Sequence, residues 1–191
     1  MKIGVFGLGY VGCVSMACLA DADHHVVGVD VNTSKVSLIN AGSPGIVEEG
    51  LDPLMRKGWE SGRIRATDDP EVALKDADVS MICVGTPGDK NGKLDLSSVY
   101  AVAGNIGQAL AHNGNFHVIM MRSTVLPGTS EKVGNIVEER SGRRGGEDFE
   151  VVSNPEFMRE GTAVQDFYNP PVTVIGTSCE RAYEMVKSVY R

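Results

Sequence analysis

The sequence predicts an α/β protein with a doubly wound, mostly parallel sheet and helices on both faces. Short apolar runs rich in β-branched residues alternate with longer amphipathic stretches along the whole chain, which is typical of repeated strand–helix units. The runs are almost continuously apolar, as expected for strands that are covered on both faces. A glycine-rich turn, Gly7 to Gly12, joins the first run to the first amphipathic stretch. Together these observations indicate a Rossmann-type fold.

Seven apolar segments are predicted to form the strands, because they are short, rich in valine and isoleucine and bounded by turn residues. In chain order they are Ile3–Phe6, Val26–Val29, Ile64–Ala66, Val79–Val84, His117–Met121, Phe149–Val152 and Val172–Ile175. The last segment follows Pro170-Pro171. Because proline cannot donate to a central ladder, we expect this strand at an edge of the sheet.

The stretches between these segments carry apolar residues at helical spacing, for example Val99, Ala103, Ile106 and Leu110. The predicted helices are Tyr10–Ala22, Ser34–Ala41, Leu51–Ser61, Pro70–Lys75, Ser97–His112, Thr129–Glu139 and one that begins near Cys179–Glu180. This last helix meets no glycine or proline before Arg191. Domains seldom finish inside a helix, so we expect residues 1–191 to be one domain of a longer protein.

The composition excludes several classes of protein. A net charge of −7 argues against nucleic acid or an anionic membrane as a partner, since both favour cationic surfaces. No apolar run approaches the roughly 20 residues of a membrane span, and the N-terminus opens into a strand instead of a signal segment. Cys13, Cys18, Cys83 and Cys179 lack the paired spacing of a metal or redox site. We therefore expect a reduced, cytoplasmic protein without a bound metal.

The turn Gly7-Leu8-Gly9-Tyr10-Val11-Gly12 has the GxGxxG form, between a predicted strand and a predicted helix. Gly7 permits a tight turn, Gly9 lets the backbone approach a pyrophosphate, and Gly12 lets the helix pack closely on the strand. Asp30 ends the second strand, 30 − 12 = 18 residues after the last glycine. An acidic residue there binds a ribose diol and repels a 2′-phosphate. The prediction is NAD over NADP, although Lys35 nearby could tolerate the extra phosphate.

Three later loops follow strands and are expected at the same edge of the sheet, where ligands bind. Gly85-Thr86-Pro87 and Arg122-Ser123-Thr124 bring hydroxyl groups to the crevice. The third loop is SNPEFMREG, residues 153–161. Asn154 is expected to cap a helical turn that begins at Pro155. That turn would place Glu156 and Glu160 on one face, with Arg159 offsetting their charge. The alternative interpretation is an ordinary capped helix start with a solvated face.

These motifs, in this order, resemble the UDP-glucose/GDP-mannose dehydrogenase family, the NAD-dependent four-electron oxidases of nucleotide sugars. The resemblance covers essentially the whole chain, through GLGYVG, VGVDVN, ICVGTP, RSTVLPGT, SNPEFMREG and PPVTVIG. The NGKLDL and RSTVLPGT forms are similar to the GDP-mannose 6-dehydrogenase branch, whereas UDP-glucose enzymes more often have lysine at Arg122. One departure is Glu49, where the family usually has proline.

The resemblance implies roles for individual residues. The positions expected to contact NAD, besides the glycines, are Tyr10, Val11, Asp30, Lys35, Thr86 and Thr124. Glu156 matches a catalytic-site glutamate and Glu160 a residue that contacts the nucleotide sugar. The family's second oxidation passes through a thioester that water hydrolyses, and this step needs a general base. We expect Glu156 to be that base, with Thr124 holding the same water.

The resemblance also shows what is absent from the sequence. The family's nucleophilic cysteine motif, and the lysine and asparagine that follow it, have no match here. Residues 1–191 would thus be an NAD-binding domain without the central helical and C-terminal nucleotide-sugar domains. The expected intact protein is a homo-oligomeric GDP-mannose 6-dehydrogenase that supplies uronic acids for polysaccharides such as alginate. UDP-glucose 6-dehydrogenase is the close alternative, and a Rossmann module that senses NAD without catalysis is a more distant one.

Overall fold

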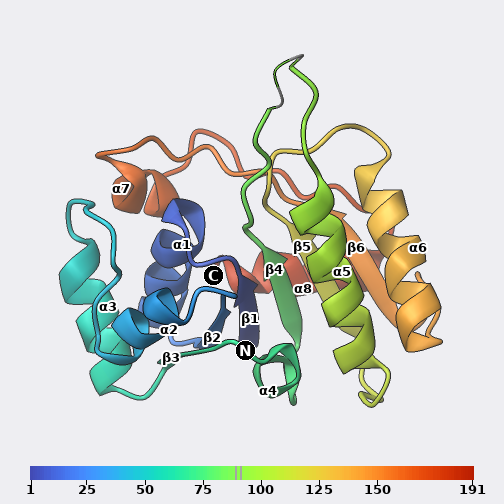
Figure 1. Cartoon of the computed structure of the whole chain (residues 1–191), viewed down its shortest axis with the longest axis horizontal. Coiled ribbons are helices and arrows are strands. Elements are labelled where there is room, and N and C mark those ends of the chain that lie inside the picture. The colour runs from blue at the N-terminus through green and yellow to red at the C-terminus, as the bar shows by residue number, and fades with distance from the viewer. Residues whose placement is uncertain (89, 91) are drawn as a thin grey trace.

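Six parallel strands form the centre of the fold in the computed structural model, which describes residues 1–88, 90 and 92–191 (Figure 1). Asp89 and Asn91, and with them the start of the NGKLDL motif, lie outside the described residues. The strands are β1 Lys2–Phe6, β2 His25–Val29, β3 Ile64–Thr67, β4 Val79–Ile82, β5 His117–Met121 and β6 Phe149–Ser153. Their order in the sheet is β3-β2-β1-β4-β5-β6. The chain order reverses between β1 and β4, which confirms the predicted Rossmann-type fold.

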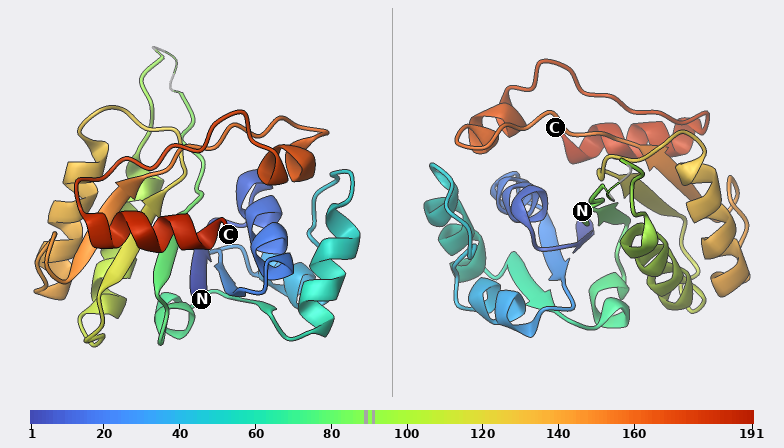
Figure 2. Two further views of the ribbon diagram at one scale, coloured as in Figure 1. Left: turned by 180° about the vertical axis from the view of Figure 1, so that it is seen from behind. Right: turned by 45° about the horizontal axis from the view of Figure 1, so that its top comes forward.

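Helices cover both faces of this sheet. They are α1 Tyr10–Asp21, α2 Thr33–Asn40, α3 Leu51–Glu60, α4 Pro70–Leu74, α5 Ser97–Leu110, α6 Thr129–Ser141, α7 Ala163–Tyr168 and α8 Glu180–Val189. One buried cluster joins the sheet to α4, α5 and α6, and a second joins it to α1, α3, α7 and α8. Figure 2 shows α8 crossing the face of the sheet opposite α5 and α6. No helix among the described residues is long and apolar enough to cross a membrane.

Strand β5 shows why the strands are continuously apolar. Val118 and Met120 belong to the cluster on the α1 side, whereas Ile119 and Met121 belong to the cluster on the α5 side. All four side chains are almost completely buried, because successive side chains of a strand point to opposite faces and both faces are covered. The packed sheet thus provides a rigid edge from which the loops after the strands emerge.

The predicted strand Val172–Ile175 is wrong. Residues 172–175 form no strand, and the residue that follows them, Gly176, makes an isolated antiparallel bridge with Ser153. Val172 and Val174 stay 49% and 37% exposed, so the segment has little apolar burial to stabilise it. The prolines before it supply no amide donors for a ladder.

The helical turn predicted at Asn154-Pro155 is also wrong. Residues 154–159 are irregular, and the next helix is α7, which the sequence analysis did not predict. Asn154 is buried, and its side-chain oxygen accepts hydrogen bonds from Arg122 and from the hydroxyl of Tyr190. A side chain engaged in this way cannot cap a helix. Helix α8 ends at Val189, and the hydroxyl of the next residue, Tyr190, donates to Asn154.

Candidate functional site

The turn between β1 and α1 has the geometry of a phosphate-binding loop. Gly7 has φ of +98°, which favours glycine, and its amide donates to the carbonyl of Val29 at 2.8 Å. A Cβ at Gly12 would lie 1.8 Å from the carbonyl oxygen of Gly7, so only glycine allows α1 to pack this closely. A Cβ at Gly9 would meet no protein atom within 4 Å, and no side chain caps the first amides of α1. These free amides suit an anionic group such as a pyrophosphate.

Asp30 lies beside this loop at the end of β2. Its Oδ2 accepts a hydrogen bond from the amide of Leu8 at 2.8 Å, and its Oδ1 accepts one from the amide of Asn32 at 2.9 Å. The side chain is only 10% exposed, and the Nζ of Lys35 lies 3.3 Å from Oδ2. The carboxylate is therefore fixed in orientation by the backbone, with one cation from α2 beside it.

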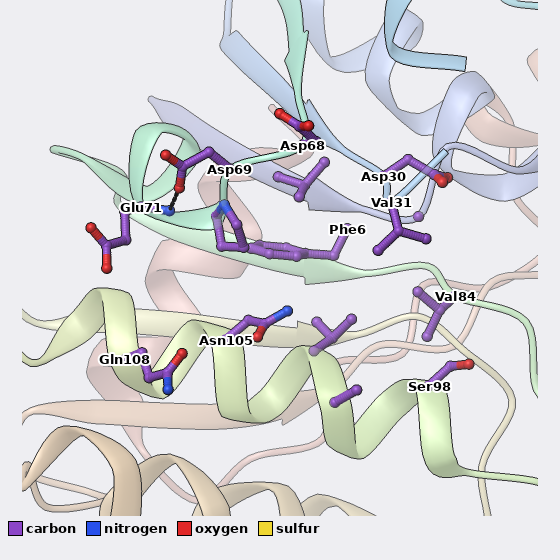
Figure 3. A pocket seen from close by; sticks show the side chains of 15 residues that line it. Phe6, Asp30, Val31, Asp68, Asp69, Glu71, Val84, Ser98, Asn105 and Gln108 are labelled. Atoms are coloured by element: carbon purple, nitrogen blue, oxygen red, sulfur yellow. Dashed lines mark hydrogen bonds between the residues drawn. The ribbon is translucent and has the colours of Figure 1, made fainter. Parts of the chain in front are cut away.

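A cavity of about 560 Å³ opens next to the loop, between the carboxyl ends of β1 to β3 and helix α5. Figure 3 shows Asp30 and Val31 at one end, with Ser98, Asn105 and Gln108 of α5 on the facing wall. Such a mixture of apolar and amide-bearing walls can hold a flat base with its ribose. The α5 residues were not predicted from the sequence, because their side chains come to this wall only through the packing of α5 on the sheet.

A second cavity, of about 290 Å³, lies on the other side of the loop. It brings together six of the residues that the sequence analysis assigned to the site, namely Gly9, Tyr10, Val11, Thr86, Thr124 and Glu156. Val84 lines both cavities, so the two spaces adjoin at the end of β4. A dinucleotide placed with its phosphates on the loop would thus have space for one nucleoside on each side.

Hydrogen bonds hold the loops after β4 and β5 together at this second cavity. The hydroxyl of Thr86 donates to the carbonyl of Thr124 at 2.8 Å, and the hydroxyl of Ser123 donates to the carbonyl of Val84 at 2.7 Å. Because its proton is used within the protein, the hydroxyl of Thr86 keeps its oxygen lone pairs for a bound group or a water.

The two glutamates of SNPEFMREG do not share a helix face. Glu156 lines the second cavity, and its Oε2 accepts a hydrogen bond from the amide of Met158 at 2.6 Å. Glu160 is exposed in the following turn and lines neither of the two cavities. Arg159 does not offset Glu156 but pairs with Asp166 at 2.8 Å, and this pair lowers the pKa of the Asp166 carboxyl. The structure thus brings Glu156, but not Glu160, to the crevice.

Comparison with known proteins gives a family match over the whole chain. The model for the NAD binding domain of the UDP-glucose/GDP-mannose dehydrogenase family matches residues 1–191. The chain belongs to this family. The cofactor of the domain is NAD, which agrees with the free amides of the glycine loop, the fixed Asp30 carboxylate and the two adjoining cavities.

Relatives and solved structures agree with this family. The chain is 46% identical to GDP-mannose 6-dehydrogenase of Pseudomonas aeruginosa and 44% identical to UDP-glucose 6-dehydrogenase of Rhizobium meliloti, matched over its full length. The structure of a ternary complex of GDP-mannose dehydrogenase from Pseudomonas aeruginosa superposes with a TM-score of 0.97, covering all of this chain. A UDP-glucose dehydrogenase from Pyrobaculum islandicum, 41% identical, superposes with a TM-score of 0.93 over 98% of the chain. The chain spans 43–44% of the length of each of these four proteins.

Within this NAD-binding domain, Glu48 is a site residue that the sequence analysis missed. It is 5% exposed, accepts hydrogen bonds from the amides of Gly161 and Ala163, each at 2.8 Å, and accepts another from the hydroxyl of Tyr10. Burial raises the pKa of Glu48, but these three hydrogen bonds outweigh burial and hold the pKa below its ordinary value. Tyr10 lines the second cavity, so Glu48 joins the wall of this cavity to the turn before α7. No local sequence pattern around Glu48 predicts this role, because its partners Gly161 and Ala163 lie far away in sequence.

The buried cysteines of this NAD-binding domain are poor nucleophiles. Cys13, Cys18 and Cys83 are buried free thiols, as predicted, and Cys179 is partly buried. Burial raises the pKa of Cys13 to about 11 and the pKa of Cys83 to about 12, so both thiols are protonated at neutral pH. Cys83 lines the second cavity and still cannot supply a thiolate there. Among the described residues, no three histidine, cysteine or acidic side chains gather in a group that could hold a metal ion.

Proposed function

We propose that this chain is the cofactor-binding part of a GDP-mannose 6-dehydrogenase. The intact enzyme would oxidise the primary alcohol of the sugar to a carboxylate, consuming two NAD and one water and releasing GDP-mannuronate and two NADH. The observation that carries the proposal is the cleft that runs from Asp30, across the glycine loop, to Thr124 and Glu156. A domain that only sensed NAD would need the first part of this cleft but not a carboxylate at its far end.

The sequence identities favour GDP-mannose 6-dehydrogenase over UDP-glucose 6-dehydrogenase. Five Pseudomonas GDP-mannose 6-dehydrogenases are 46–47% identical to the chain, against 44% for the UDP-glucose enzyme of Rhizobium meliloti. This margin is small, so UDP-glucose 6-dehydrogenase remains the second candidate. We further propose that the intact enzyme acts in the cytoplasm as a homo-oligomer in polysaccharide synthesis, as the family resemblance implies.

In the proposed mechanism the bound NAD would accept the hydride. This chain binds the cofactor and positions the water that hydrolyses the thioester. Gly7, Gly9 and Gly12 present the loop and the start of α1 to the pyrophosphate. Tyr10, Val11, Thr86 and Thr124 line the nicotinamide half of the cleft. Asp30 fixes the adenosine ribose, and Lys35 acts through its contact with Asp30. Glu160, exposed next to the turn held by Glu48, is available to a sugar that enters from outside.

Glu156 is proposed to take a proton from the hydrolytic water, with the oxygen of Thr124 holding that water in the same cavity. General-base assistance contributes about 10² to 10⁴ in rate. In a complete enzyme, Glu156→Gln should keep NAD binding, slow thioester hydrolysis by such a factor, and accumulate substrate on the enzyme's cysteine. Rapid-quench mass spectrometry measures this adduct. Hydrolysis at the wild-type rate would show that Glu156 is structural.

A chimera tests the overall proposal. The chain replaces the NAD-binding domain of the Pseudomonas aeruginosa GDP-mannose 6-dehydrogenase in one protein and that of the Rhizobium meliloti UDP-glucose 6-dehydrogenase in another. We expect the first chimera to produce NADH from GDP-mannose and to be the more active of the two. The chain alone is the control and should produce none, because covalent catalysis needs a thiolate that it lacks. Activity in the second chimera only would favour UDP-glucose, and two inactive chimeras that bind NAD would favour a sensor.

A further inference from the structure

Arg122 is a buried cation for which no salt-bridge partner is found among the described residues. It directly follows β5, lines the second cavity and is 7% exposed. Its Nη1 donates to the side-chain oxygen of Asn154 at 3.3 Å and to the hydroxyl of Tyr190 at 3.1 Å, while its buried Nε has no acceptor. Within the described part of the chain, no carboxylate oxygen lies within 4.0 Å of the guanidinium. A guanidinium stays protonated in proteins, so its positive charge is uncompensated at short range.

Packing alone does not account for this charge. Asn154 and Tyr190 are neutral and already bonded to each other, so a neutral donor could complete their network without the desolvation cost of a buried ion. The field of Arg122 also reaches its neighbours, since it opposes the rise that burial causes in the pKa of Cys83 and of Tyr190. The charge of Arg122 therefore acts on any group that is bound in the second cavity.

Two charged side chains line the second cavity, Arg122 and Glu156. The other titratable groups there, Cys83 and Tyr10, are uncharged at neutral pH, because burial raises the pKa of each to about 12. Thr86, Thr124 and the glycines contribute only dipoles. Among the described residues that line this end of the cleft, one guanidinium and one carboxylate carry the charges, and the Glu48 carboxylate lies behind Tyr10.

We propose that Arg122 determines which redox form of the cofactor the domain prefers. The nicotinamide ring of NAD⁺ is cationic and that of NADH is neutral, whereas both forms carry the same pyrophosphate, so the charge of Arg122 disfavours the oxidised form relative to the reduced form. Glu156 acts on the same ring with the opposite sign. A unit charge about 10 Å away, at an effective dielectric constant of about 20, changes the ratio of the two affinities by roughly tenfold. Arg122 thereby makes bound NAD⁺ a better hydride acceptor.

The test measures the dissociation constants of NAD⁺ and NADH for the 191-residue chain at one ionic strength. Arg122→Gln, which keeps an amide donor for Asn154 and Tyr190, should lower the ratio Kd(NAD⁺)/Kd(NADH) roughly tenfold. Arg122→Lys, the matched control that keeps the charge, should leave the ratio close to that of the wild type. ADP-ribose, which keeps the pyrophosphate but lacks the nicotinamide, should change in affinity by the same factor as NADH in each variant.

An unchanged ratio in Arg122→Gln would overturn the proposal, as would an equal change in Arg122→Lys. If the glutamine variant does not fold, Arg122→Met carries the same expectation. Glu156→Gln should move the ratio in the opposite direction, and a shift in the same direction would contradict an electrostatic origin. A chain that binds neither form would instead refute the cofactor assignment on which the inference rests.

Discussion

At the scale of single residues, we propose that Asp30 selects NAD over NADP. Its carboxylate is fixed by the amides of Leu8 and Asn32, so it cannot turn away from a 2′-phosphate. Asp30→Asn keeps an oxygen for the backbone but removes the charge, and Lys35 at 3.3 Å is then free to attract the phosphate. We expect the preference for NAD over NADP to fall at least about tenfold, or about 1.4 kcal/mol, as measured by calorimetry.

The matched control for this substitution is Asp52→Asn, since Asp52 is exposed on α3 far from the glycine loop in sequence. It should leave both affinities unchanged. If Asp30→Asn keeps the wild-type preference, the carboxylate is not the discriminating group and its hydrogen bonds serve only to shape the loop.

At the scale of elements, Glu48 joins α1 to the turn before α7. Glu48→Gln replaces one carboxylate oxygen by an NH₂ group, which cannot accept the hydrogen bond of a backbone amide. A buried amide left without its partner costs about 1–3 kcal/mol, which lowers the melting temperature by several degrees in a domain of this size. We also expect weaker binding of NAD and little change for AMP, because Tyr10 lines only the second cavity. Calorimetry measures both effects.

Exposed Glu49 provides the control, since Glu49→Gln should have neither effect. The pH dependence gives a further check. The pKa of Glu48 is lowered in the folded state, so its contribution is complete above the unfolded value of about 4.3 and is lost as the pH falls through the folded value. The difference in melting temperature between the wild type and Glu48→Gln should therefore shrink below about pH 4. A constant difference would mean that the charge of Glu48 does not contribute.

The elements also show what could be predicted from the sequence. The glycine loop and Asp30 depend on local geometry: a positive φ, a close approach of helix and strand, and a fixed spacing. Short sequence motifs therefore predicted where they lie. Glu48 and Arg122 act through partners such as Ala163 and Tyr190, more than 60 residues away, and no local pattern reveals them. The same distant contacts occupy Asn154 and explain why the predicted helical turn does not form.

At the scale of the whole molecule, the doubly wound sheet brings the loops after β1, β2, β4, β5 and β6 to one edge. The order β3-β2-β1-β4-β5-β6 puts the glycine loop at the reversal point, Asp30 on one side and Thr124 and Glu156 on the other. The central claim is that this edge forms one continuous NAD site, with the residues proposed for water activation at its far end.

A crystal structure of the 191-residue chain with bound NAD tests this claim most directly. The predicted result has the pyrophosphate over Gly9 and the start of α1, a ribose hydroxyl on Asp30, and the nicotinamide in the cavity of Thr124 and Glu156. A cofactor whose nicotinamide lies outside that cavity, or whose adenosine ribose does not touch Asp30, would contradict the account.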